Sequence, residues 1–110
     1  NVIFRSHTME KLTSTQCYEK CYSTPYFWAH LMADGELYGC SAYLQQSKFC
    51  YGNLKETTFQ EVWESEKRQK SIKYVRDKLD ISGCRANCRM DEVNGYLWRL
   101  KHPKEHDNFI

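Results

Sequence analysis

A chain of 110 residues and 13.2 kDa is long enough for one small domain, or it is a piece of a longer protein. Its 27% charged and 41% hydrophobic residues, with only two prolines and five glycines, exclude collagen-like, low-complexity and fully disordered chains. The net charge of +2 is too small to indicate nucleic acid, and no apolar run is long enough to span a membrane, so neither partner is expected.

The start of the chain is mostly polar, and we expect residues 1–16 to be a lead-in from a missing preceding domain. The remainder, 17–110, is expected to form one domain. Because the chain begins with Asn1, it is expected to be a processed chain or an excised fragment. The start also lacks the apolar segment of a signal peptide, and we expect a cytoplasmic protein.

A β-hairpin is predicted first. Two apolar stretches, 26–33 and 36–40, are joined by Asp34-Gly35, which is a strong hairpin signal. Alternation along the first stretch predicts two faces, one with Phe27, Ala29, Leu31 and Ala33, and the other with Trp28, His30 and Met32. Gly52-Asn53 predicts a turn after the next short apolar stretch.

Helices are predicted after this turn. Thr58 and Glu61 have the spacing of a capping box. Three apolar stripes at helical spacing follow: Phe59, Val62 and Trp63, then Ile72, Val75 and Leu79, then Met90, Val93, Leu97 and Leu100. Gly83 is expected to end the second stripe and Pro103 the third. The order predicts a small α+β domain, in which a β-hairpin is followed by short helices. Together with the cysteines described next, these elements are expected to surround a cysteine-ligated metal cluster.

Six cysteines are the most unusual feature of the composition, and four of them are candidate ligands. Cys21 and Cys40 bracket the hairpin, whose two ends are neighbours in space. Cys84 and Cys88 are expected at the start of the last helix, where residues i and i+4 share a face and thiolates are favoured. Four thiols are enough for a [4Fe–4S] cluster or a tetrahedral zinc ion. The alternative is that some of them are buried structural thiols.

Other residues are weaker candidates. The remaining two cysteines are second-choice ligands: Cys17 and Cys50. His102 and His106 follow the last cysteine pair at the loose spacing of a C2H2 zinc finger, but Pro103 disfavours helical geometry at His102. His30 is expected to be a hairpin residue that faces the core or a cluster pocket.

Four motifs in order along the chain resemble one family. They are Cys21-x13-Gly35-x4-Cys40, Gly-Asn-Leu-Lys-Glu at 52–56, Thr-Phe-Gln-Glu-Val-Trp at 58–63, and Cys-Arg-Ala-Asn-Cys-Arg-Met at 84–90. Together they resemble SPASM domains, the C-terminal auxiliary-cluster domains of radical S-adenosylmethionine enzymes. The similarity covers roughly residues 17 to 100.

The closing cysteine group is shorter than in a full SPASM pattern, because only Cys84 and Cys88 are present. In this respect the chain is similar to the shortened twitch variant, which holds one auxiliary [4Fe–4S] cluster. That analogy implies that Cys21 and Cys40 complete the ligand set. Two basic residues flank the closing pair and either balance the charge of the cluster or are solvated: Arg85 and Arg89.

The resemblance implies electron transfer and the positioning of a peptide or small-molecule substrate. The parent enzyme would bind S-adenosylmethionine in a barrel of at least about 200 residues, which this chain lacks. No Cys-x3-Cys-x2-Cys motif is present, since Thr24 stands where the third cysteine after Cys17 and Cys21 would be. We therefore assign no catalytic residue. The alternatives are a structural zinc-binding interaction module, an interaction domain with unligated thiols, and a secreted disulfide protein.

Overall fold

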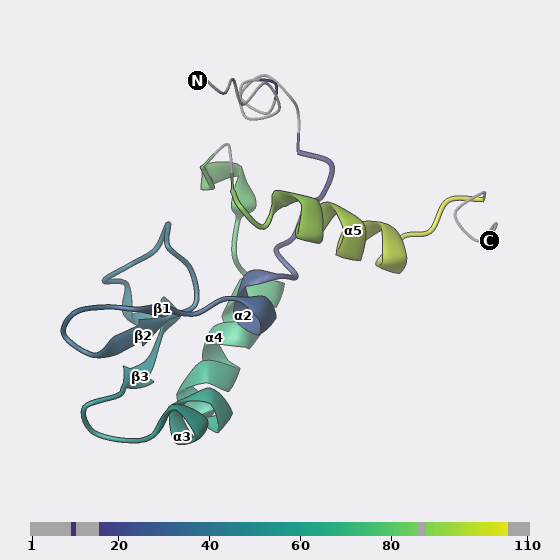
Figure 1. Cartoon of the computed structure of the whole chain (residues 1–110). Coiled ribbons are helices and arrows are strands. Elements are labelled where there is room, and N and C mark those ends of the chain that lie inside the picture. Colours follow the sequence, from purple (N-terminus) through teal and green to yellow (C-terminus); the bar gives the residue numbers. More distant parts are fainter. Residues whose placement is uncertain (1–9, 11–15, 86–87, 106–110) are drawn as a thin grey trace, which may run out of the picture.

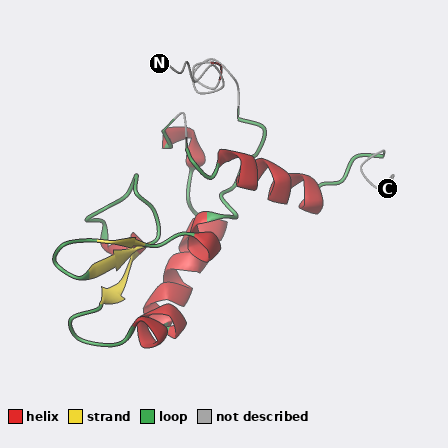
Figure 2. Cartoon of the chain, in the orientation of Figure 1, coloured by secondary structure: helices red, strands yellow, loops and turns green. Residues whose placement is uncertain are grey.

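The computed structural model describes residue 10 and residues 16–85 and 88–105. Within them, a three-stranded antiparallel sheet in the order β1-β2-β3 is accompanied by several short helices, so the expected α+β class is confirmed. Helix α4 packs against strand β3 and against helices α3 and α2, whereas helix α5 lies apart from the sheet (Figures 1 and 2).

The predicted hairpin is confirmed, but its first strand is short. Strands β1 (His30–Leu31) and β2 (Glu36–Tyr38) pair antiparallel. The turn between them is closed by a hydrogen bond from the Gly35 backbone N–H to the Met32 carbonyl at 3.0 Å, with Gly35 at φ +90°, where glycine is favoured. The expected beginning of the strand is instead helix α2 (Thr24–Phe27), because Pro25 suits the first turn of a helix.

The two faces of the first hairpin stretch have different environments. Phe27 and Leu31 are exposed, with 62% and 60% of their surface accessible. Met32, from the opposite face, packs against the main hydrophobic core. The face predicted from Trp28, His30 and Met32 is therefore the one that turns toward the interior.

Strand β3 (Cys50–Asn53) was not predicted, because its Gly-Asn sequence indicates a turn. It pairs with β2 through a β-bulge, in which Leu37 lies opposite Gly52 and Tyr38 lies opposite Cys50. The bulge allows two consecutive residues, Cys50 and Tyr51, to be buried at once. Cys50 belongs to the main core and Tyr51 to a second, smaller one.

Helices α3 (Phe59–Glu64) and α4 (Glu66–Asp77) meet at a single residue. The predicted capping box is present at the start of α3. Ser65 both ends α3 and begins α4: its hydroxyl donates to the Val62 carbonyl at 2.7 Å and accepts from the Arg68 N–H at 3.1 Å. The helix predicted from the second stripe ends at Asp77, earlier than the expected end at Gly83.

The last cysteine pair does not lie on a helix, which corrects the prediction that both thiols share a helix face. Cys84 ends the 3₁₀ turn Ile81–Gly83. Cys88 precedes helix α5 (Asp91–Lys101), and its carbonyl accepts the Asp91 N–H at 3.0 Å. Asp80 caps the 3₁₀ turn by accepting the N–H of Ser82, so Cys84 follows a separate turn and is not part of α5.

The main core lies between the sheet, α4 and the segment before α2. Its buried members include Tyr18, Cys21, Tyr38, Phe49, Cys50, Val75 and Ile81. Arg68 of α4 is also buried, with 7% of its surface accessible, and its guanidinium lies 3.7 Å from the Trp63 ring centre. It donates to the carbonyls of Trp63 at 2.9 Å and Pro25 at 2.8 Å, and so it joins α2, α3 and α4.

Candidate iron–sulfur site

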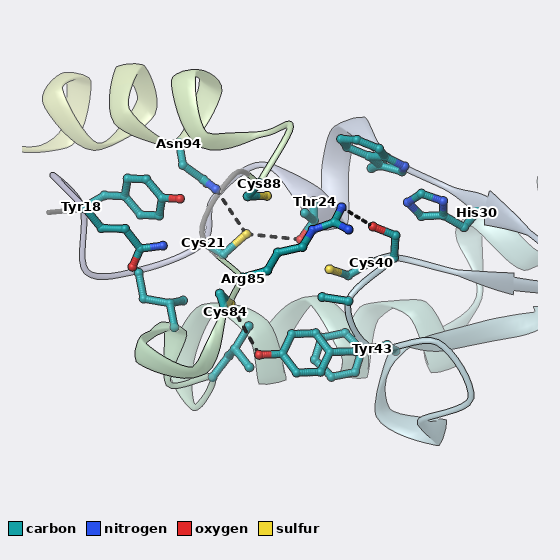
Figure 3. Close-up of a pocket in the computed structure, with 17 residues that line it drawn as sticks. Tyr18, Cys21, Thr24, His30, Cys40, Tyr43, Cys84, Arg85, Cys88 and Asn94 are labelled. Carbon is teal, nitrogen blue, oxygen red and sulfur yellow. Dashed lines mark hydrogen bonds between the residues drawn. The ribbon is translucent and has the colours of Figure 1, made fainter. Parts of the chain in front are cut away.

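Four cysteines from separate segments line one pocket beside the main core (Figure 3). Cys21 comes from the segment before α2, and Cys40 follows β2. Cys84 follows the 3₁₀ turn, and Cys88 lies just before α5. The pocket has about 570 Å³ of space between atoms, part of it open to solvent. The rest of its wall is largely apolar, with Phe49, Leu79 and Ile81 among its members.

Cys21 is the most enclosed of the four, with 8% of its surface accessible. The hydroxyl of Thr24 lies 3.2 Å from its Sγ atom. From the other side, the side-chain amide of Asn94 on helix α5 approaches Sγ at 3.6 Å (Figure 3). The Ser23 hydroxyl lies farther from this atom, at 3.9 Å. Polar groups from the start of α2 and from α5 therefore contact one sulfur atom.

Cys84 has an aromatic partner. The hydroxyl of Tyr43 lies 3.4 Å from its Sγ atom, and the Tyr43 ring stacks on Phe49 with the ring centres 4.4 Å apart. Phe49 in turn meets Tyr74 edge-on. The contact between Tyr43 and Cys84 is thus fixed by packing in the main core.

The other two cysteines do not line the pocket. Cys17 is exposed, close to Gly95 of α5. Cys50 is buried, and its Sγ atom receives the Lys67 amine at 3.4 Å. All six cysteines lie in the described part of the chain, and each is a free thiol. No disulfide therefore supports the secreted alternative.

The zinc-finger arrangement is not formed by the described residues. His102 ends α5, where it is exposed and its ring stacks on Trp98 with the ring centres 3.9 Å apart. His106 lies outside the described residues. Among the described residues, no group of three or more His, Cys, Asp or Glu side chains is arranged so that it could bind a single metal ion. The four pocket thiols thus line a common space without meeting at one point.

A comparison with known families decides the class of the chain. A family model described as the SPASM iron–sulfur cluster-binding domain matches residues 21–89. The chain belongs to the SPASM family. No curated protein and no solved structure matches it. The resemblance seen in the sequence motifs is thereby confirmed, and with it iron–sulfur cluster binding, so the zinc-binding alternative is not favoured.

The electrostatics of the SPASM pocket oppose free thiolates. Burial raises the pKa of Cys40, and the neighbouring thiols of Cys21, Cys88 and Cys84 raise it further. Burial also raises the pKa of Cys84. Without bound iron the thiols of Cys40 and Cys84 would stay protonated at neutral pH, and a metal must displace their protons to bind.

Two basic residues stand at the wall of the pocket. Arg85 lines it and donates to the Ser41 hydroxyl at 2.8 Å. His30 also lines it, stacked on Trp28, and has a buried Nε2 atom without a hydrogen-bond partner among the described residues. Burial lowers the pKa of His30, and the positive charges of Arg85 and Arg89 lower it further. His30 is therefore neutral at pH 7, and Arg85 is the fixed positive charge at this pocket wall.

The donor set fits an iron–sulfur cluster. Four cysteine thiols, a mostly apolar wall and polar groups aimed at sulfur are what such a cluster requires. Sequence reasoning missed two polar groups that contact the sulfur of Cys21: Thr24 and Asn94. Only Asn94 could have been found from the sequence, because it is a polar residue on the predicted apolar face of the last helix, four residues after Met90.

No helix among the described residues is long and apolar enough to cross a membrane.

Proposed function

We propose that this SPASM domain holds one [4Fe–4S] cluster through Cys21, Cys40, Cys84 and Cys88. One observation carries the proposal: these four cysteines line a common pocket, and the other two do not. The thiolates would each bind one iron, and the cluster would take up or give up a single electron with little rearrangement.

We further propose that the domain is an accessory part of a radical S-adenosylmethionine enzyme. Its roles would be electron transfer and the positioning of a peptide or small-molecule substrate next to the catalytic barrel of the parent chain. The pocket is partly open, which supports access by an electron partner or a substrate. His30 and Arg85 at its wall offer polar contacts for a substrate.

Anaerobic reconstitution of the 110-residue chain with ferrous iron and sulfide tests the cluster. We expect a brown protein with about four irons and four sulfides per chain, because each thiolate binds a different iron. Metal analysis that finds about one zinc and no iron under the same conditions would overturn the proposal.

A cysteine-to-serine series identifies the ligands. Cys21→Ser, Cys40→Ser, Cys84→Ser and Cys88→Ser should each lose most of the bound iron, because a serine hydroxyl is a poor ligand for these irons. The matched controls are the cysteines outside the pocket, and Cys17→Ser and Cys50→Ser should keep the wild-type iron content. Iron loss in a control, together with full retention in a pocket variant, would refute the ligand assignment.

A further inference from the structure

Asn94 is one of the most buried polar side chains of the domain, with 2% of its surface accessible. Its Oδ1 atom accepts two backbone hydrogen bonds, from the N–H of Tyr22 at 2.8 Å and from the N–H of Ser23 at 3.0 Å. Two donors converge on this atom, so it must be the amide oxygen. The NH₂ group therefore has to face the other way, where it lies 3.6 Å from Cys21 Sγ.

A second donor reaches the same sulfur. The Thr24 hydroxyl lies 3.2 Å from Cys21 Sγ, and next to a metal-bound thiolate it would serve as the donor. Both groups are neutral and come from different elements, helix α2 and helix α5. In Figure 3 they approach Cys21 from opposite sides.

Helix α5 is thereby part of the site, although it begins after the residues that match the SPASM model, 21–89. A further contact fixes its first turn to the segment before α2, where the Tyr18 hydroxyl donates to the Asp91 carboxylate at 2.8 Å. The position of Asn94 is set by this docking, and the buried amide has its hydrogen-bonding groups engaged on both sides.

We infer that Asn94 and Thr24 are positioning residues that raise the reduction potential of the cluster by donating hydrogen bonds to the sulfur of Cys21. This inference rests on the proposed cluster ligation. On reduction, the cluster takes up one electron from a chemical reductant or an electrode, and no bond to Cys21 forms or breaks. Added negative charge spreads onto the ligand sulfurs, so donors to sulfur stabilise the reduced state more than the oxidised state.

Asn94→Asp is the sharpest test. The carboxylate keeps an oxygen for the Tyr22 and Ser23 N–H groups, but it puts an acceptor in place of the donor to Cys21. The test uses the reconstituted 110-residue chain and an anaerobic redox titration followed by electron paramagnetic resonance. We expect a potential more negative by at least about 59 mV, a tenfold fall in the reduced-to-oxidised ratio at a fixed potential.

Asn53→Asp is the matched control. The Asn53 amide has the same hydrogen-bonding pattern, accepting from the Lys55 N–H at 2.9 Å and donating to the Asp34 carbonyl at 3.3 Å, but it lies in the hairpin region and outside the pocket lining. It should leave the potential unchanged. An equal potential in Asn94→Asp and Asn53→Asp would overturn the inference.

Thr24→Val separates the hydrogen bond from the charge that aspartate adds. Valine has nearly the same shape as threonine and removes only the donor, so the potential should again become more negative, by less than in Asn94→Asp. If Asn94→Asp does not fold, Thr24→Val decides, and an unchanged potential then refutes the inference. A wild-type chain that binds no iron overturns the proposed function and this inference together. Full iron with unchanged potentials overturns the inference alone.

Discussion

Gly39 stands directly before the proposed ligand Cys40, and the ring of Tyr51 packs across it. A methyl group at Gly39 would lie 2.0 Å from the Tyr51 hydroxyl oxygen and 2.5 Å from the ring carbon that carries it. Tyr51 is itself buried, with 2% of its surface accessible, so its ring has no free space to enter. The glycine is therefore required by a close approach next to the pocket.

We predict that Gly39→Ala lowers the free energy of unfolding by about 1–3 kcal/mol, as overpacking of a filled core does. Urea denaturation of the chain measures the difference. Gly83→Ala is the control, because among the described residues no atom beyond its chain neighbours lies within 4 Å of a methyl group added there. Equal stability of the two variants would show that Tyr51 moves aside without cost.

The capping box of helix α3 makes a prediction at the scale of one element. The Thr57 hydroxyl and the Thr58 backbone N–H both donate to the Glu61 carboxylate, and they lower the pKa of Glu61 from 4.5 to about 2. Because this pKa is lowered in the folded state, the stabilisation is present above pH 4.5. It is lost as the pH falls toward 2.

Glu61→Gln should therefore lower the melting temperature at pH 7 and should reduce the difference in melting temperature between pH 7 and pH 2. Thermal unfolding followed by circular dichroism at the two pH values measures this. The control is Glu64→Gln, whose carboxylate is contacted by the Gln60 side chain on the same helix face. A pH dependence of Glu61→Gln equal to that of the wild type would contradict the assignment.

Local signals in the sequence were sufficient to predict some elements of the fold but not others. The capping box at Thr58 was readable because all of its partners lie within four residues. Strand β3 could not be predicted, because Gly52 becomes extended only through its pairing with Leu37 and its close contact with Val62. When tertiary contacts place turn-forming residues in a strand, a single sequence carries no local signal for that strand.

The grouping of the four pocket thiols was predicted, but one reason given for it was wrong. Cys84 and Cys88 were expected on one helix face, whereas they lie in the turn region before α5. Both line the pocket all the same, together with Cys40, which follows β2. Two of the groups that contact sulfur come from elements distant in sequence, Asn94 beside Cys21 and Tyr43 beside Cys84, and only folding brings them together. That the four thiols bind the cluster stays a prediction.

At the scale of the whole molecule, Arg68 connects helices α2, α3 and α4 through buried hydrogen bonds. Arg68→Met keeps the length of the side chain but leaves the carbonyls of Trp63 and Pro25 without their buried donor. We predict a loss of about 2–4 kcal/mol in the free energy of unfolding, because hydrogen bonds from a charged group are lost at buried carbonyls. Equilibrium urea denaturation measures it.

Lys70→Met, two residues further along α4, is the control for this prediction. Its amine pairs with Glu66 at 3.0 Å, but the two side chains are 72% and 82% exposed. An exposed pair of this kind contributes about 0–1 kcal/mol, so the control should stay close to the wild type. If Arg68→Met is as stable as Lys70→Met, the contacts of Arg68 with Pro25 and Trp63 do not hold the helices together.

The junction at Ser65 has a consequence for how the length of this chain can vary. One residue serves both helices, so the chain has no spare length between them. An insertion there would rotate α4 by about 100° around its axis, since a helix has 3.6 residues per turn. Arg68 and Val75 would then leave the sides on which they are buried. Insertions and deletions should therefore be tolerated in the turn at 32–35 but selected against between α3 and α4.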